Sequence, residues 1–457
     1  MHAHVDSLCI KGSLFTLIFP LWKNLKFLRI IFKVFHNSIK PVFSHILKDF
    51  PGFTQIHSPY GGYDENYLYS FFILSIFNER KLSTTMKLTF QKDVLLNGIN
   101  IVLKAVSSKT TMSILGCILI DASGSEIKLT GNDMELGIET KIEGNILERG
   151  KIALDAKIFS EIIRKLSSPD AEIHIETDDA LKTVISSENS VFKIQGRDSE
   201  EFSYLPYIER EHSITLSQFT LREIIRQTLF SISPNDSNKM MTGELFEVHG
   251  NELKVVSLDG HRISIRKIIL KENYDDVKVI VPGKTLSEIS KILNGDNESE
   301  VELFFSQNHI LFAFDQTIVV SRLIEGEYFR INQMLSGDYE TKFTVNKKDF
   351  LDCIERATIL IRENDKKPLI LNILDHSMEL KLNSSFGSMN AELSIHKTGK
   401  DIMIGFNPKF LIDALRVIDD EEIDLHMMNP KSPCFIRDED QNYIYLILPV
   451  NFNAASV

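Results

Sequence analysis

The segment Asp259, Gly260, His261 and Arg262 places a carboxylate, an imidazole and a guanidinium within four residues. These groups could in principle perform acid–base or phosphoryl chemistry. Adjacent residues seldom converge on one substrate, and Asp-Gly is a dipeptide typical of tight turns. We therefore interpret the segment as the exit from the strand ELKVVSL, with side chains that line a groove. A nucleic-acid-processing enzyme centred on Asp259, His261 and Arg262 is the alternative.

Other signatures of catalysis or metal binding are incomplete. The segment PGKT at 282–285 lacks the glycine that a phosphate-binding loop needs five residues before its Gly-Lys pair, because Lys278 occupies that position. Asp133 and Glu135 fit the polar edge of a strand better than a catalytic pair. These segments therefore give no support for a catalytic site or a metal site.

Length, charge and cysteine usage limit the classes of protein. A chain of 457 residues exceeds the size of a single core and predicts two to four domains. The net charge of −12 excludes a surface that is basic throughout, but it allows a local basic stripe. The four cysteines lie far apart without a CxxC pair, which favours a reducing cytoplasm. Residues 14–35 are apolar but carry four basic residues, so they are a poor membrane span.

Residues 1–85 differ from the rest of the chain. They are rich in phenylalanine and show no sustained period. Nine basic and five acidic residues give them a net charge of about +4, which leaves about −16 for the remainder. From Met86 the sequence becomes regular, with the alternating strand KLTF and then a helix whose apolar residues are Leu95, Ile99, Val102 and Val106. We interpret residues 1–85 as an extension outside the fold, and a basic amphipathic membrane or partner segment as the alternative.

An internal repeat divides the regular part. Three amphipathic helices align, with starts 127 and 125 residues apart: KIFSEIIRKL from Lys157, KTLSEISKIL from Lys284 and KFLIDALRVI from Lys409. A second helical set repeats at intervals of 126 and 130 residues, near Leu95, Leu221 and Leu351, and Ser217 and Asn346 are expected to cap its later members. Each repeat therefore contributes two helices.

Short alternating strands lie between these helices, such as VELFF, ILFAF and YIYLIL. Their connections are too short for crossover helices, so the pairing should be mainly antiparallel. The predicted fold class is α+β, with three repeated domains at residues 86–208, 209–336 and 337–453.

The repeated helices also place basic residues on one face. Each has a second basic residue seven positions after its first lysine, about two helical turns later: Lys157 with Arg164, Lys284 with Lys291, and Lys409 with Arg416. A single pair would be ordinary solvated surface. Three pairs at equivalent positions predict a positive surface for a phosphate backbone, contacted without sequence preference. The first helices add Lys92, Lys104 and Arg226 to these basic residues. A DNA-binding regulator with sequence selectivity is a further alternative.

Six segments occur in a familiar order: MKLTF, SSKTTMSILGCI, LTGNDMEL, SLDGHRI, SRLIEGEY and YLILPV. With them the chain resembles the beta subunit of bacterial DNA polymerase III, the sliding clamp, over residues 86–452. The resemblance implies a non-catalytic, cytoplasmic processivity factor that encircles double-stranded DNA. It implies a head-to-tail homodimer forming a six-domain ring with the helices around the hole. It also implies a clamp loader, replicative and repair polymerases that dock through short peptide motifs, and no cofactor or membrane.

The resemblance also implies site residues by matching position. The peptide groove would comprise Met241, Gly260, His261, Arg262, Ile263, Phe329, Met334, Leu446, Leu448, Pro449 and Val450. Lys109 and Lys239 would join the basic pairs near DNA, and Phe192 and Ile194 would meet Ile359 and Leu360 at the dimer interface. Two residues depart from the family pattern, because Phe329 and Ser113 stand where the family usually has proline.

Overall fold

The computed structural model describes residues 85–107, 110–166, 168, 171–210, 213–234, 238–335, 337–362 and 367–452. All of them belong to one compact unit, Leu82–Val457. The proposed extension at 1–85, apart from its last residue, and the proposed DNA contact Lys109 lie outside the described residues. The expected repeats at 86–208, 209–336 and 337–453 are called below the first, second and third repeats.

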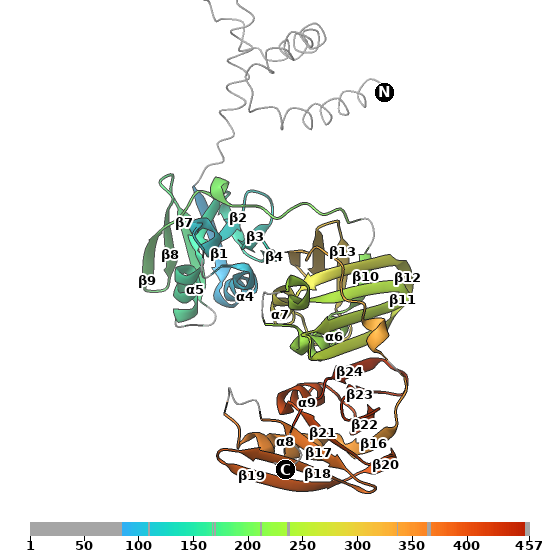
Figure 1. The fold of residues 1–457 in the computed structure, drawn as a ribbon. Helices are drawn as coiled ribbons and strands as arrows, with labels where there is room; N and C mark the ends of the chain where they lie inside the picture. The colour runs from blue at the N-terminus through green and yellow to red at the C-terminus, as the bar shows by residue number, and fades with distance from the viewer. Residues whose placement is uncertain are drawn as a thin grey trace, which may run out of the picture. The chain divides into compact units, whose positions relative to one another are not determined.

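Each repeat contains two α-helices, as the sequence predicts (Figure 1). They are α4 (Lys92–Val102) and α5 (Ala156–Lys165), α6 (Gln218–Thr228) and α7 (Gly283–Ile289), and α8 (Lys347–Thr358) and α9 (Pro408–Leu415). Both expected caps are present: the Ser217 hydroxyl accepts from the Thr220 amide at 3.0 Å, and the Asn346 side chain accepts from the Asp349 amide at 3.1 Å. These bonds satisfy amides that the helix itself leaves unpaired.

The first repeat contributes a sheet of its own and half of a second sheet. The five-stranded sheet has the order β5-β1-β7-β8-β9, formed by β5 (Asn145–Glu148), β1 (Met86–Gln91), β7 (Glu172–Thr177), β8 (Lys182–Ser187) and β9 (Ser190–Gln195). The remaining strands of this repeat are β6 (Lys151–Asp155), β2 (Cys117–Asp121), β3 (Ile127–Asn132) and β4 (Leu136–Ile142). These four continue into the second repeat.

The first two repeats share an eight-stranded sheet, of order β10-β13-β14-β15-β4-β3-β2-β6. The second repeat supplies β10 (Ser213–Ser217), β13 (Glu300–Phe305), β14 (His309–Phe314) and β15 (Thr317–Arg322). The two halves meet where β15 pairs antiparallel with β4, in the register Val319 opposite Ile138. Backbone hydrogen bonds therefore join the first repeat to the second.

The second and third repeats are joined in the same way. A seven-stranded sheet has the order β11-β12-β24-β23-β22-β16-β20. Its strands are β11 (Gly243–Leu258), β12 (Arg262–Pro282), β24 (Tyr443–Ile447), β23 (Cys434–Arg437), β22 (Glu422–Met427), β16 (Thr341–Asn346) and β20 (His396–Gly399). The junction is the antiparallel pair of β12 and β24. The third repeat ends in a four-stranded sheet, β19 (Gly387–Ser394), β18 (Ser377–Ser384), β17 (Leu369–Ile373) and β21 (Ile402–Phe406).

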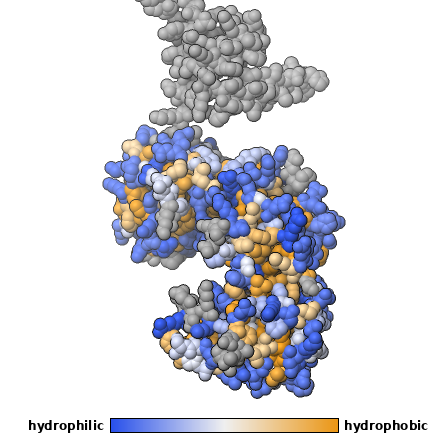
Figure 2. All heavy atoms as spheres, in the orientation of Figure 1, coloured by the Kyte–Doolittle hydropathy of each residue, from blue (hydrophilic) through white to orange (hydrophobic). Residues whose placement is uncertain are grey.

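The apolar positions that recur in the sequence form the cores. Phe159, Leu286 and Leu411, the first matched positions of the repeated helices, are all fully buried. One cluster extends through the first two repeats, a second fills the third, and a third covers the junction of β12 with β24. Figure 2 shows apolar side chains gathered where the second and third repeats meet. Every strand pair in the described residues is antiparallel, so the predicted α+β class is confirmed.

The side chain of the first residue of each first helix forms a hydrogen bond with the backbone of the segment that follows the second helix. Lys92 donates from Nζ to the Leu166 carbonyl at 2.6 Å, and Lys347 donates to the Ile418 carbonyl at 2.7 Å. In the second repeat the Gln218 side chain accepts from the Asn294 amide at 2.8 Å. The expectation that Lys92 adds to a basic surface is therefore wrong. Lys92 is buried, and its ammonium group donates to a carbonyl oxygen at the end of a helix.

No helix in the described ranges is long and apolar enough to cross a membrane, and residues 14–35 lie outside those ranges. Cys117, Cys353 and Cys434 are buried free thiols. Among the residues that the structure describes, no cluster of three or more His, Cys, Asp or Glu is arranged to hold a metal ion.

Candidate functional site

The segment Asp259–Arg262 is a tight turn between β11 and β12. One oxygen of the Asp259 carboxylate accepts from the amides of His261 at 2.9 Å and Arg262 at 3.1 Å. The other accepts from Nε of Arg262 at 3.0 Å. Gly260 has a φ of +86°, a conformation that side chains rarely adopt. The predicted turn is confirmed, and Asp259 is engaged in holding it.

Arg262 fastens the second repeat to the third. Its guanidinium donates to Asp413 of α9 at 2.7 Å and to the Phe230 carbonyl at 2.6 Å. It also lies 4.6 Å from the ring centroid of Phe410 and 5.3 Å from that of Phe230. The side chain is buried, and each of its three guanidinium nitrogens donates to a partner within the protein. This arrangement gives Arg262 a positioning role at the junction.

The residues proposed for the peptide groove gather at this junction. Ile263 on β12 lies directly opposite Leu446 on β24, and both are buried. The chain beyond β24 then crosses the Asp259–Arg262 turn, because the Leu448 amide donates to the His261 carbonyl at 2.9 Å. Leu448 and Val450 are each 36% exposed, and Pro449 between them is half-buried. Apolar side chains are thus accessible beside buried ones.

The opposite side of the proposed groove comes from two short segments. Met241 lies in the 3-10 turn Lys239–Thr242 and packs on the junction cluster, together with Tyr328 and Ile331. Phe329 and Met334 are 37% and 58% exposed, and the Phe329 ring meets the Tyr328 ring edge-on at 5.8 Å. Phe329, which replaces the usual proline, is therefore held by an aromatic neighbour.

The basic residues of the repeated helices are exposed, but many are paired. Lys157, Lys284 and Lys409 lie at the starts of α5, α7 and α9. The second basic residue of each set was expected in the same helix. This is correct for Arg164 alone, because α7 and α9 end before Lys291 and Arg416. Those three residues form ion pairs with Glu161, Glu288 and Glu355.

These ion pairs reduce the positive charge that the sequence suggests. Lys284 is paired with Asp133, and Arg226 with Glu223 and Asp419. Within the described ranges no ion pair involves Lys157 or Lys409. Lys239 is exposed at the start of its 3-10 turn. Among the matched basic residues of the repeated helices, the positive charge without an acidic partner in the described residues is therefore at the starts of α5 and α9.

The proposed interface residues divide into exposed and half-buried ones. Phe192 on β9 is 36% exposed, and Ile359, just beyond α8, is 81% exposed. Ile194 and Leu360 are half-buried against the cores of their own repeats. Phe192 and Ile359 are therefore the two of these four residues that a second copy could cover.

Sequence reasoning missed the contacts that position these sites. In both junctions, the turn between two strands of one repeat contacts the second helix of the next: Asp133 with Lys284 on α7, and Arg262 with Asp413 on α9. Each pair is 151 residues apart in the chain. The sequence did contain one indication of these contacts. Asp133 and Asp259 are 126 residues apart, so both turns occupy the same position in the repeat.

Comparison with known proteins agrees with this architecture. Family models for the DNA polymerase III beta subunit match in three parts: the N-terminal domain at residues 86–206, the central domain at 215–329 and the C-terminal domain at 332–451. The chain belongs to the DNA polymerase III beta subunit family, the beta sliding clamps. The resemblance seen in the sequence is confirmed.

Relatives support the same assignment over most of the chain. A beta sliding clamp of Staphylococcus epidermidis is 34% identical over 376 residues, covering 80% of this chain and 99% of that protein. The sliding clamp of Bacillus subtilis has a crystal structure similar to this one, with 34% identity, a TM-score of 0.78, and coverage of 81% of this chain and all of that one. A structure assigned as a DNA polymerase III beta subunit from Eubacterium rectale is 64% identical, with a TM-score of 0.78, and covers 80% of this chain and all of that one.

Family membership decides between the hypotheses left open by the sequence. As a beta sliding clamp, the protein is a processivity factor of DNA polymerase III and a non-catalytic subunit. The enzyme centred on Asp259, His261 and Arg262 and the sequence-selective regulator are set aside. The geometry agrees, since Asp259 and Arg262 bind each other and the junction.

Proposed function

We propose that two copies of residues 86–453 close head to tail into a ring around double-stranded DNA, with domains at 86–208, 209–336 and 337–453. A clamp loader would open this ring in the cytoplasm, and replicative and repair polymerases would dock on it. Such a ring confers processivity because it cannot fall off, so it needs only weak, sequence-independent contacts with phosphates.

The observation that carries the proposal is the equivalence of paired and unpaired sheet edges. At the two junctions the last strand of one repeat, β15 or β24, pairs with a strand of the preceding repeat, β4 or β12. In the first repeat the strand equivalent to β15 and β24 is β9, and in the third repeat the strand equivalent to β4 and β12 is β19. Each is the edge strand of its sheet in the described residues. Unpaired edges invite a further strand. A second copy would supply one by pairing its β9 with β19.

A side-chain contact supports the same pairing. In the second junction the Asp259–Arg262 turn packs on α9, where the His261 ring stacks on Phe410 at 6.0 Å. The position equivalent to Phe410 on α5 is Ile158, and the equivalent turn of the third repeat, between β18 and β19, carries Phe386. Ile158 is 51% exposed and Phe386 53% exposed. We assign Phe386 and Ile158 to the dimer interface beside Phe192, Ile194, Ile359 and Leu360.

The DNA-facing residues of the proposed ring are eight basic side chains, six of which lie near the starts and ends of α5, α7 and α9. They are Lys109, Lys157, Arg164, Lys239, Lys284, Lys291, Lys409 and Arg416. Because Lys157 and Lys409 have no acidic partner in the described ranges, they would supply most of the contact with phosphates.

The proposed docking groove is walled by Met241, Gly260, His261, Arg262, Ile263, Phe329, Met334, Leu446, Leu448, Pro449 and Val450. The exposed Leu448 follows the buried pair Ile263 and Leu446, and its amide donates to the His261 carbonyl. Such a surface buries one or two apolar anchors of an extended peptide, which concentrate the binding energy.

Sedimentation of the full chain tests the ring. Wild type should sediment as a dimer, and Phe386→Glu or Ile158→Glu should yield monomers, because each buries a charge at the interface. Tyr207→Glu is the control, since Tyr207 is 93% exposed and lies outside the proposed interface. Dimers that persist in both interface variants would contradict the assignment of these residues, and a monomeric wild type would contradict the ring.

A further inference from the structure

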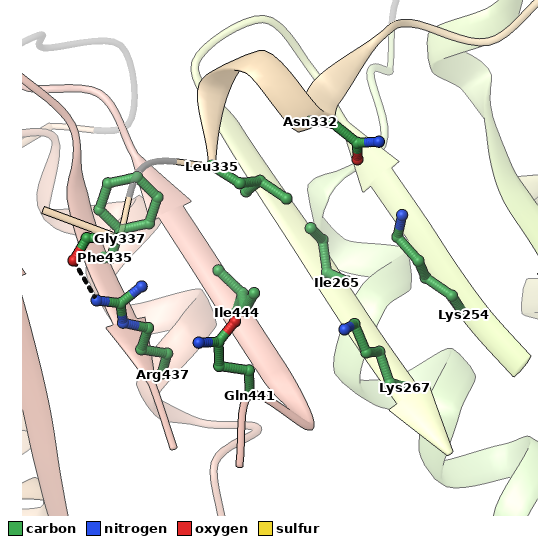
Figure 3. A pocket seen from close by; sticks show the side chains of 10 residues that line it. All are labelled: Lys254, Ile265, Lys267, Asn332, Leu335, Gly337, Phe435, Arg437, Gln441 and Ile444. Carbon is green, nitrogen blue, oxygen red and sulfur yellow. Dashed lines mark hydrogen bonds between the residues drawn. The ribbon is translucent and has the colours of Figure 1, made fainter. Parts of the chain in front are cut away.

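A second pocket lies on the same face of the junction sheet as the proposed groove, but shares no residue with it. Its volume is about 170 Å³. Figure 3 shows its lining side chains, which come from β11, β12, β23, β24, the turn before β24 and the segment connecting the second and third repeats. They are Lys254, Ile265, Lys267, Asn332, Leu335, Gly337, Phe435, Arg437, Gln441 and Ile444.

The register of the four strands explains the character of this face. Directly paired residues point to the same face of a sheet, and rows two residues apart share it. The row nearest the groove is Leu258, Ile263, Leu446 and Phe435; the next is Val256, Ile265, Ile444 and Arg437. In the third row Lys254 lies directly opposite Lys267. The face thus changes from apolar to cationic within two rows, roughly 13 Å.

The cations of this pocket are incompletely neutralised. Lys254 leans away to Glu247 at 3.2 Å, while Lys267 has no ion pair in the described ranges. Arg437 donates to the Gly337 carbonyl at 3.2 Å and lies 5.8 Å from the Phe435 ring centroid. Like charges directly opposite each other on a sheet are destabilising, and both lysines are half-buried. Lys254 is already paired with Glu247, so an anion between Lys267 and Arg437 would offset the charge of the other two cations.

The acidic residues that follow β23 do not fill that role. Asp438, which follows β23, accepts from the Asn442 side chain at 2.8 Å and from the Tyr443 amide at 3.1 Å, so it is engaged in its own turn. Glu439 and Asp440 are exposed and do not line the pocket. The pocket therefore has an apolar floor, Ile265 and Ile444, beside cations that an outside carboxylate can reach.

We propose that this pocket is a second anchor site for docking partners, which takes an acidic side chain next to an apolar one. The inference rests on the proposed docking function and adds a site outside the groove. The volume is below the roughly 300 Å³ typical of small-molecule sites, which suits one or two side chains. An acidic protein segment is favoured over DNA, because the pocket lies on the face of the sheet away from the helices. Ile265 and Ile444 lie on this face. Ser264 and Tyr445 lie on the other face, which meets Ser231 and Phe230 near the helices that would surround DNA in the proposed ring.

The test uses two dipeptides that differ in charge alone, N-acetyl-Leu-Glu-amide and N-acetyl-Leu-Gln-amide. Each is titrated into the full chain while the methyl groups of Ile265, Ile444 and Leu335 are observed by NMR. The acidic peptide should shift these signals saturably and bind about tenfold more tightly, the difference between a charge-assisted and a neutral hydrogen bond.

A double variant, Lys267→Gln with Arg437→Gln, should bind the two peptides equally. Lys271→Gln is the matched control, because Lys271 lies on the same strand but pairs with Glu300 outside the pocket. Equal affinities in wild type, a preference that survives in the double variant, or no shift with either peptide would overturn the proposal. Displacement of the acidic peptide by a short DNA duplex would assign the site to nucleic acid instead.

The groove can fail independently of this pocket. The Leu448→Ala and Pro449→Ala double variant changes no lining residue of the pocket, so it should keep the preference for the acidic dipeptide. Loss of polymerase docking in that variant reports on the groove alone. Retained docking there would contradict the proposed groove, whatever the dipeptides do.

Discussion

Arg262 on β12 donates to Asp413 on α9 across 2.7 Å, and this ion pair connects the second and third repeats beside their shared strand pair and apolar cluster. The Arg262 side chain is 8% exposed and the Asp413 side chain 21% exposed. Burial makes the loss of one partner costly, because the other charge stays without compensation.

Replacing Arg262 should therefore destabilise the junction. We expect Arg262→Met to lower the free energy of unfolding in urea by about 3 kcal/mol, because Asp413 would be left partly buried without its partner. Arg322→Met is the control: Arg322 is about half exposed, and its pair with Glu325 should contribute less than about 1 kcal/mol. Equal effects of the two substitutions would show that the buried pair does not hold the junction.

Docking of a polymerase should depend on the segment that crosses the Asp259–Arg262 turn. The Leu448→Ala and Pro449→Ala double variant removes exposed apolar surface beside Ile263, so binding of the polymerase should weaken at least about tenfold in surface plasmon resonance. Ring assembly, measured by sedimentation, should be unchanged. Leu147→Ala provides the control, since Leu147 is 69% exposed on β5, outside the groove. Unchanged polymerase binding would remove the groove assignment.

Retention on DNA should respond to Lys157 and Lys409 more than to the paired residues. Changing both to glutamine should weaken binding to duplex and flatten the dependence of log affinity on log salt by about 1 for each lost phosphate contact. Arg164→Gln with Arg416→Gln should have a smaller effect, because glutamates already neutralise these side chains. Affinity measured across a salt series distinguishes the two, and equal slopes would contradict the proposed order.

The stability of the second repeat should fall as the pH rises. Glu244 on β11 is fully buried, neither carboxylate oxygen has a hydrogen-bond partner in the described ranges, and burial raises its pKa to about 8 from 4.5. Between those values the folded protein holds a proton that the unfolded chain has released. The free energy of unfolding should therefore decline from pH 4.5 to 8, by on the order of 5 kcal/mol, and then level off.

Glu244→Gln should remove this decline, since glutamine stays neutral. Comparing wild type with this variant at each pH also cancels the opposite effect of His426, whose pKa burial lowers to about 4 and which destabilises the folded state as the pH falls below 6.5. Glu272→Gln, at an exposed position on β12, should leave the decline intact. An identical decline in wild type and Glu244→Gln would mean that Glu244 is not the group responsible.

Local periodicity predicted much of this fold. The helical spacing that gave Phe159, Leu286 and Leu411 as core positions depends on neighbours within one helix, and so do the caps at Ser217 and Asn346. The pairing of β15 with β4 and of β12 with β24 depends on residues far apart in the chain, and no local pattern specifies it.

In the candidate sites too, local features could be predicted and contacts between distant residues could not. The Asp259–Arg262 turn could be predicted, because an Asp-Gly dipeptide after a strand constrains its own backbone. The partner Asp413 could not be predicted, nor could the burial of Lys92, since both depend on helices brought together by the fold. The second pocket was missed for a similar reason, because four strands from two repeats form its face.

The most direct test of the central claim, a ring that holds DNA by topology, is retention on a circle before and after cutting. The protein is loaded onto nicked circular duplex by its clamp loader, separated from free protein by gel filtration, and the DNA is then cut once. We expect the protein to stay on the circle, to leave the linear product, and to be retained again when both ends are blocked by bound proteins. Equal retention on cut and uncut DNA would contradict it.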